Sequence, residues 1–143
     1  MSITLSSNVA CPHRGGRLAT DARGRLYAVW YTEAAGDRPD LLRAVADDGR
    51  RFARPHRVNV ASGSAPDHPR LAVNAAGRGV VVWEDSTAVV AGSCYALSSK
   101  AIRAWAPDVA VAREGFVVAW YEEQFPATRT IVRSVSVKEV EGR

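Results

Sequence analysis

The chain has 143 residues, of which 47% are hydrophobic and 24% charged, so we expect one globular domain with its own core. Its net charge of +4 comes from 17 arginines and two lysines against 15 acids, and the arginines are scattered rather than gathered into the basic stripe of a nucleic-acid surface. No apolar run could span a bilayer and the first residues do not resemble a signal peptide, so we expect no nucleic-acid or membrane partner and, for the chain as written, a cytoplasmic location.

One sequence phrase occurs three times: a short apolar run, a turn containing glycine, and a second apolar run that ends in tryptophan. The copies span residues 13–30, 67–83 and 106–120 and end at Trp30, Trp83 and Trp120. Their apolar runs are short and rich in β-branched and aromatic residues, which indicates strands, and the Asp or Asn that opens the first two turns, with a glycine near the end of each, indicates hairpins. A phrase repeated at this spacing predicts a repeat architecture built from similar β-units.

Additional strands are expected outside these copies. They lie over residues 40–46 and 57–60 in the first unit, 93–98 and 100–105 in the second, and 129–137 in the third. The second unit is shorter than the first, so we expect it to be compact or incomplete. The third unit ends without a fourth strand. Residues 1–8 have the pattern of an outer strand whose own first three strands are missing.

These short strands, with the connections marked by Pro66 and Pro107, favour an all-β fold of three antiparallel β-propeller blades, and an open β-sandwich is the alternative. We expect one half-propeller domain over residues 1–143. It consists of the orphan strand 1–8, a first blade over 13–60, a shortened second blade over 66–104, and a third blade over 105–140 that lacks its outer strand.

Three blades do not close a ring, because propellers have four to eight. We therefore expect a homodimer in which strand 1–8 of each copy completes the third blade of the other, giving a six-bladed ring. The competing interpretation is that the chain is part of a longer propeller.

The turn Asp47-x-Gly49-x-x-Phe52 resembles the Asp-box of sialidase-like (BNR repeat) β-propellers, although Val45 stands where that motif has Ser or Thr. The phrases 26–30 and 80–85 are also similar to blades of bacterial sialidase-like proteins, many of which are exported. The resemblance implies that Asp47, Gly49 and Phe52 are structural. It also implies that ligands bind on the opposite face, over the loop that leads into each blade and the loop after its second strand.

On that face, the positions at the entry to the three blades align as Arg17, Arg70 and Asp108. Sialidases hold a substrate carboxylate with three arginines, because guanidinium and carboxylate pair in a bidentate manner, but here the third position is acidic. The other candidate ligand-binding residues are Asp67, His68, Glu84, Asp85, Trp105 and Glu122. Trp105 is either a platform for stacking sugars or an aromatic filler between blades.

No catalytic residue is assigned, because Tyr121 and Glu122 are adjacent in a strand and point to opposite faces, which makes a poor Tyr–Glu pair. Cys11, His13 and His68 fit no metal-ligand spacing, and Cys11 and Cys94 are either free thiols or a pair. We therefore expect no metal and no cofactor. The leading hypothesis is a non-catalytic binding or scaffolding module for a glycan or protein ligand. The alternatives are an exo-sialidase-type glycoside hydrolase assembled from two chains, and a fragment without independent activity.

Overall fold

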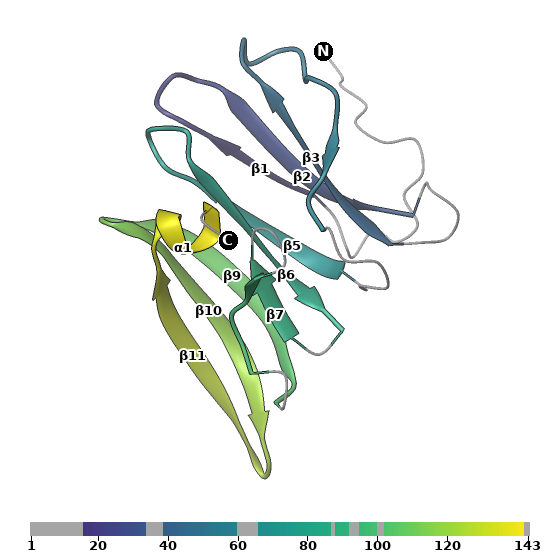
Figure 1. Cartoon of the computed structure of the whole chain (residues 1–143), viewed down its shortest axis with the longest axis vertical. Helices are drawn as coiled ribbons and strands as arrows, with labels where there is room; N and C mark the ends of the chain where they lie inside the picture. The colour runs from purple at the N-terminus through teal and green to yellow at the C-terminus, as the bar shows by residue number, and fades with distance from the viewer. Residues whose placement is uncertain are drawn as a thin grey trace.

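The computed structural model describes residues 16–33, 39–59, 66–86, 88–91, 95–99 and 102–141, which form three separate antiparallel sheets (Figure 1). This confirms the predicted all-β class. The predictions for strand 1–8, Cys11, His13 and Cys94 lie outside the described residues. Within these ranges there is no helix with the length and hydrophobicity to cross a bilayer.

Each sheet collects strands that are consecutive in the chain. Sheet I contains β1 (Gly16–Thr20), β2 (Leu26–Thr32), β3 (Asp40–Ala46) and β4 (His56–Arg57) in that spatial order. Sheet II contains β5 (Pro66–Val73), β6 (Gly79–Asp85), β7 (Ala88–Ala91) and β8 (Tyr95–Ala96). Sheet III contains β9 (Ala104–Ala112), β10 (Gly115–Gln124) and β11 (Ala127–Val135), and the short helix α1 (Val137–Glu141) follows it.

Sheet II differs from its prediction. Its third strand is β7, which returns directly from β6 because Asp85 pairs with Ala88 across a tight connection. Of the strand expected over 93–98, residues 93 and 94 lie outside the described residues, and β8 covers Tyr95 and Ala96. Of the strand expected over 100–105, residues 100 and 101 also lie outside the described residues, and Ala104 and Trp105 begin β9 of sheet III instead. In the described residues sheet II therefore has four strands, of which β7 and β8 are short.

The three sheets stack face to face, with sheet II in the middle (Figure 1). Side chains alternate between the two faces of a strand, and β6 uses both faces in this way. Val81 and Trp83 pack toward sheet I, whereas Val80 and Val82 pack toward sheet III. The core between sheets I and II comprises Val29, Tyr31, Leu41, Val81, Trp83 and Val90. The core between sheets II and III includes Val82, Val89, Phe116, Val118 and Trp120.

The first strands of the sheets are neighbours, because β5 contacts both β1 and β9. The turns after β1 and β5 are also in contact, through a hydrogen bond from the Ala22 N–H to the Ala75 carbonyl (3.3 Å). We call this side of the molecule the hairpin edge. The opposite side, where β1, β5 and β9 begin and β2, β6 and β10 end, is the start edge.

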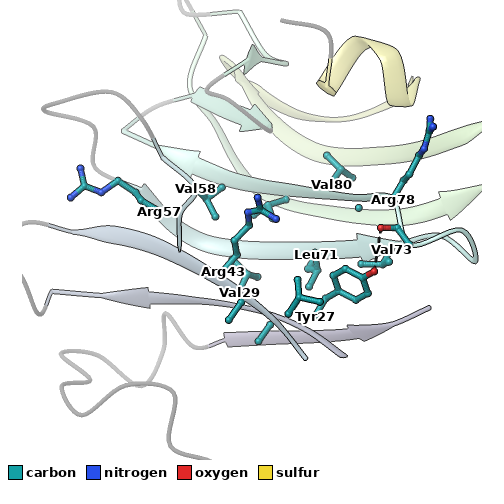
Figure 2. A pocket seen from close by; sticks show the side chains of 15 residues that line it. Tyr27, Val29, Arg43, Arg57, Val58, Leu71, Val73, Arg78 and Val80 are labelled. Atoms are coloured by element: carbon teal, nitrogen blue, oxygen red, sulfur yellow. Dashed lines mark hydrogen bonds between the residues drawn. The ribbon is translucent and has the colours of Figure 1, made fainter. Parts of the chain in front are cut away.

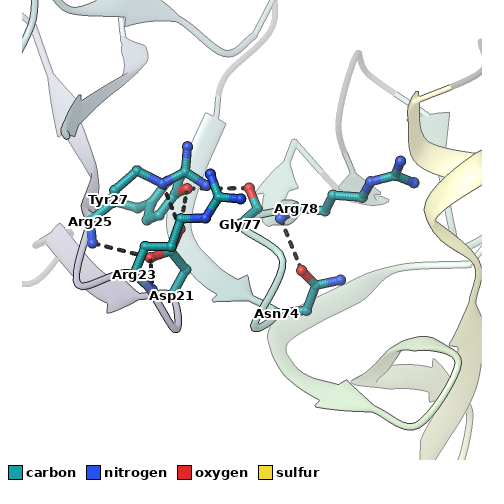
Figure 3. Close-up of polar contacts among 7 residues, drawn as sticks. All are labelled: Asp21, Arg23, Arg25, Tyr27, Asn74, Gly77 and Arg78. Carbon is teal, nitrogen blue, oxygen red and sulfur yellow. Dashed lines mark hydrogen bonds and ion pairs between the residues drawn. The ribbon is translucent and has the colours of Figure 1, made fainter.

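A polar cluster joins sheets I and II at the hairpin edge (Figure 3). Oδ1 of Asp21 accepts the backbone N–H groups of Arg23 (2.9 Å) and Arg25 (3.1 Å), and Oδ2 pairs with Nε of Arg25 (2.6 Å). The Tyr27 hydroxyl lies 3.1 Å from Oδ2 of Asp21 and 3.3 Å from the carbonyl oxygen of Gly77 in the neighbouring sheet. Burial opposes ionisation of Asp21, but these hydrogen bonds outweigh it and lower its pKa from 3.8 to about 2.

The turn expected to resemble an Asp-box differs from its prediction in one residue. The carboxylate that accepts backbone N–H groups belongs to Asp48, from Arg50 and Arg51 (2.8 Å each), and not to Asp47. The same bonds lower the pKa of Asp48. Gly49 has the expected positive φ of 67°, and Phe52 packs against the cluster of Ala28, Trp30 and Ala44. A Cβ on Gly49 would lie 3.1 Å from the Gly24 carbonyl, which places this turn at the hairpin edge.

Candidate functional site

The residues that the sequence assigned to ligand binding lie along or beside the start edge, away from the Asp48 turn. Two of the three first strands have a matching irregularity there. His68 and Ala106 both have positive φ angles, 46° and 50°, and both precede prolines that are fully buried. The pairing register shifts at both places. Because a positive φ is costly for residues other than glycine, the packing around the prolines must impose this conformation.

His68 lies between two carboxylates. Its Nδ1 atom is 3.4 Å from Oδ1 of Asp67 and 3.7 Å from Oε1 of Glu84, and this buried nitrogen makes no hydrogen bond. Oε1 of Glu84 also accepts the backbone N–H of Ala106 (2.6 Å). The structure thus brings together three of the predicted residues, Asp67, His68 and Glu84, and uses Glu84 to tie sheet II to sheet III.

The predicted arginine positions are only partly brought together. Nε of Arg70 lies 3.9 Å from Oδ1 of Asp108, a long ion pair in which the Asp108 side chain remains 79% exposed. Such an exposed pair contributes little to stability. Arg17 is exposed, and its Nη1 donates to the carbonyl of its neighbour Gly16 (2.8 Å). Arg17 therefore does not join Arg70 and Asp108 in one cluster.

Two predicted acids bind tryptophans of their own strands. The indole N–H of Trp83 donates to Asp85 (3.3 Å), and that of Trp120 donates to Glu122 (2.9 Å). In sheet I the corresponding position is Thr32, and the buried Trp30 indole nitrogen has no hydrogen-bond partner. The acid two residues after tryptophan is therefore a structural acceptor in sheets II and III, a role that the sequence analysis missed and that a Trp-x-acid pattern could have suggested.

Trp105 belongs to a small aromatic group on the outer face of sheet III, the face turned away from sheet II. Its ring centroid is 6.1 Å from that of Tyr121, and the Arg103 guanidinium lies 5.4 Å from the Trp105 ring centroid. Phe125, at the tip of the β10–β11 hairpin, is 94% exposed. The sequence analysis did not single out Arg103, Tyr121 or Phe125 as binding residues, because the pairing of Trp105 with Tyr121 is known only once β9 lies beside β10.

The described ranges contain no group of three or more His, Cys, Asp or Glu side chains placed to hold a metal ion. Comparisons with protein-family models, with curated proteins and with solved structures found no match for this chain.

Proposed function

We propose that the protein is a non-catalytic binding and scaffolding module, built as three propeller blades of the sialidase-like kind and closed into a six-bladed ring by a second copy of the chain. The observation that carries this proposal is the outer face of sheet III. It carries Ala119, Tyr121 and Val132, and none of the sheets in the described ranges packs against it.

The repeat alignment allows the exposed fractions of equivalent residues in the three sheets to be compared. Val29 and Val82, the residues before the first two tryptophans, are 1% and 0% exposed because the next sheet covers them. The equivalent residue of sheet III, Ala119, is only half-buried. Tyr31, just after the first tryptophan, is 5% exposed, whereas its equivalent Tyr121 is 44% exposed. The outer face also carries Val132, which is 65% exposed. Sheet III thus presents the face that, in sheets I and II, binds the next sheet.

A second copy fits this face for two reasons. The tryptophans of sheets II and III each pack toward the preceding sheet, and Trp30 of sheet I points the same way, toward the side where a partner's sheet III would lie. Sheet III also has three strands in the described residues where the other two have four, which leaves β11 as an edge. We predict that residues 1–8 of the partner copy pair with that edge. A two-fold dimer makes both contacts twice and leaves no open end.

We place the ligand, a glycan or a protein, at the start edge, where Arg17, Arg70 and the exposed Phe125 supply charge and apolar surface. Three acids at this edge have structural hydrogen bonds, since Asp85 and Glu122 accept the indole N–H groups and Glu84 accepts a backbone N–H, and this favours a role without catalysis. A general acid needs a carboxyl group free to reach the substrate.

The second candidate is an exo-sialidase-type hydrolase assembled from two chains. It is favoured by Arg17 and Arg70, which occupy the same position in the first strands of sheets I and II. One assay separates the two functions: incubation with a fluorogenic sialoside, alongside a binding titration with a sialic-acid-terminated oligosaccharide. Binding without turnover, weakened by Arg17→Ala, supports the module. Turnover that is abolished by Arg17→Ala or Arg70→Ala would establish the hydrolase instead.

A further inference from the structure

A cleft of about 440 Å³ opens between sheets I and II, away from the predicted ligand face (Figure 2). Its volume falls within the range of small-molecule sites. The walls come from β2, β3 and β4 on one side and from β5 and β6 on the other. The apolar lining includes Val29, Val45, Val58, Leu71, Val80 and Val81.

The polar lining of this cleft is cationic. It contains three arginines, Arg43, Arg57 and Arg78, and no Asp or Glu. In Figure 2, Arg43 lies in the middle of the cleft, with Arg57 and Arg78 toward its two ends. Nη2 of Arg57 pairs with Asp40 (2.9 Å), which offsets one of the three charges.

Arg43 is the unusual member of this group. It is on β3 two residues after Leu41, which is fully buried between the sheets, and it pairs across the sheet with Val29, which is also buried there. By strand alternation, Arg43 therefore points to the face of sheet I that packs on sheet II, where the neighbouring positions are apolar. Within the described part of the chain, its guanidinium has no hydrogen-bond or ion-pair partner.

Although it stands on the face toward sheet II, Arg43 is exposed, so its guanidinium is solvated and accessible to an anion that enters the cleft. We propose that the cleft binds an organic anion, with a carboxylate or phosphate group held by Arg43 and an apolar portion lying on Val29, Leu71 and Val81. Guanidinium binds both kinds of oxyanion through paired N–H groups, and among the described lining residues there is no carboxylate to compete for Arg43. Arg78 adds a second cation at the rim near the hairpin edge.

The test uses two fluorescent probes, the aryl sulfonate 8-anilinonaphthalene-1-sulfonate and the uncharged N-phenyl-1-naphthylamine, titrated into the full chain. We expect Arg43→Gln to raise the Kd of the anionic probe roughly tenfold, the effect of losing one charged hydrogen-bonding group, and to leave the uncharged probe unchanged. Arg113→Gln is the matched control, because Arg113 is exposed in the β9–β10 turn and lies outside the cleft. Displacement by decanoate or by decyl phosphate then distinguishes the two head groups.

Equal binding of the anionic probe to wild type and Arg43→Gln would overturn the proposal, as would an equal loss in Arg113→Gln. Arg78→Gln provides a second variant, since Arg78 is exposed and its backbone bond to Asn74 does not involve the substituted side chain. We expect Arg78→Gln to weaken binding of the anionic probe less than Arg43→Gln does, and unchanged binding in both variants would contradict the site. The result does not depend on the dimer, because the whole cleft lies within one chain.

Discussion

Gly77 tests how tightly sheets I and II are joined at the hairpin edge. Two turn glycines have nearly the same backbone conformation, with φ of 82° at Gly77 and 77° at Gly24. Their surroundings differ. A Cβ on Gly24 would meet nothing within 4 Å, whereas a Cβ on Gly77 would overlap the Arg25 guanidinium and lie 2.7 Å from the Tyr27 hydroxyl and 2.8 Å from Oδ2 of Asp21. Substituting each glycine with alanine therefore separates backbone strain from packing.

The magnitudes follow from these contacts. Alanine in the left-handed region costs about 1–2 kcal/mol, and both variants incur this cost. At Gly77 the added methyl group must also displace the hydroxyl of Tyr27 and the carboxylate of Asp21, and each lost hydrogen bond costs about 1 kcal/mol. We expect the free energy of unfolding to fall by about 1–2 kcal/mol in Gly24→Ala and by about 3–4 kcal/mol in Gly77→Ala.

Urea unfolding followed by tryptophan fluorescence measures both changes, and circular dichroism checks that the variants remain folded. The double variant Gly77→Ala/Tyr27→Phe should recover part of the difference between the two glycine variants, because the phenylalanine ring has no hydroxyl to displace. Equal destabilisation of Gly24→Ala and Gly77→Ala would refute the contact between the two sheets at this edge.

Three further predictions concern single side chains. The pKa of Asp21 is about 2 in the folded state, against 3.8 for an unperturbed aspartate in the unfolded chain, so its contribution is present above pH 3.8 and is lost as the pH falls toward 2. An acid titration should therefore destabilise the wild type more than Asp21→Asn, and parallel curves would contradict this. Glu122→Ala should lower the free energy of unfolding by about 1 kcal/mol in urea, whereas Glu122→Gln, which keeps an acceptor for Trp120, should have little effect. Val132→Asp should leave the circular dichroism spectrum unchanged but weaken dimer formation, and the exposed Ala76→Asp should not.

The features that could be predicted from the sequence are the local ones. The turns beginning at Asp21 and Asn74 form as expected, because an Asp or Asn side chain followed by glycine specifies its own hydrogen bonds within a few residues. The apolar run before Trp83 also forms a strand as expected, and because this run is nearly continuous, β6 can pack on both of its faces.

The features that could not be predicted depend on non-local pairing. β7 is a run of four residues that becomes a strand only because β6 provides a partner for it. Asp47 and Asp48 are chemically equivalent, and the path of the backbone through the turn decides which carboxylate faces the N–H groups. The ion pair of Arg70 with Asp108 joins two sheets. In the same way, the sequence indicates only that Arg43 lies in a strand and is solvated. Its place in the cleft follows from the packing of sheet II beside sheet I.

The central claim is that sheet III is covered by a second copy. The most direct measurement is the mass of the protein in solution, by light scattering coupled to size-exclusion chromatography at several loading concentrations. We predict twice the 15.4 kDa of one chain, shifting toward the single-chain mass in Val132→Asp. A wild-type mass equal to one chain at every concentration would contradict ring closure by dimerisation.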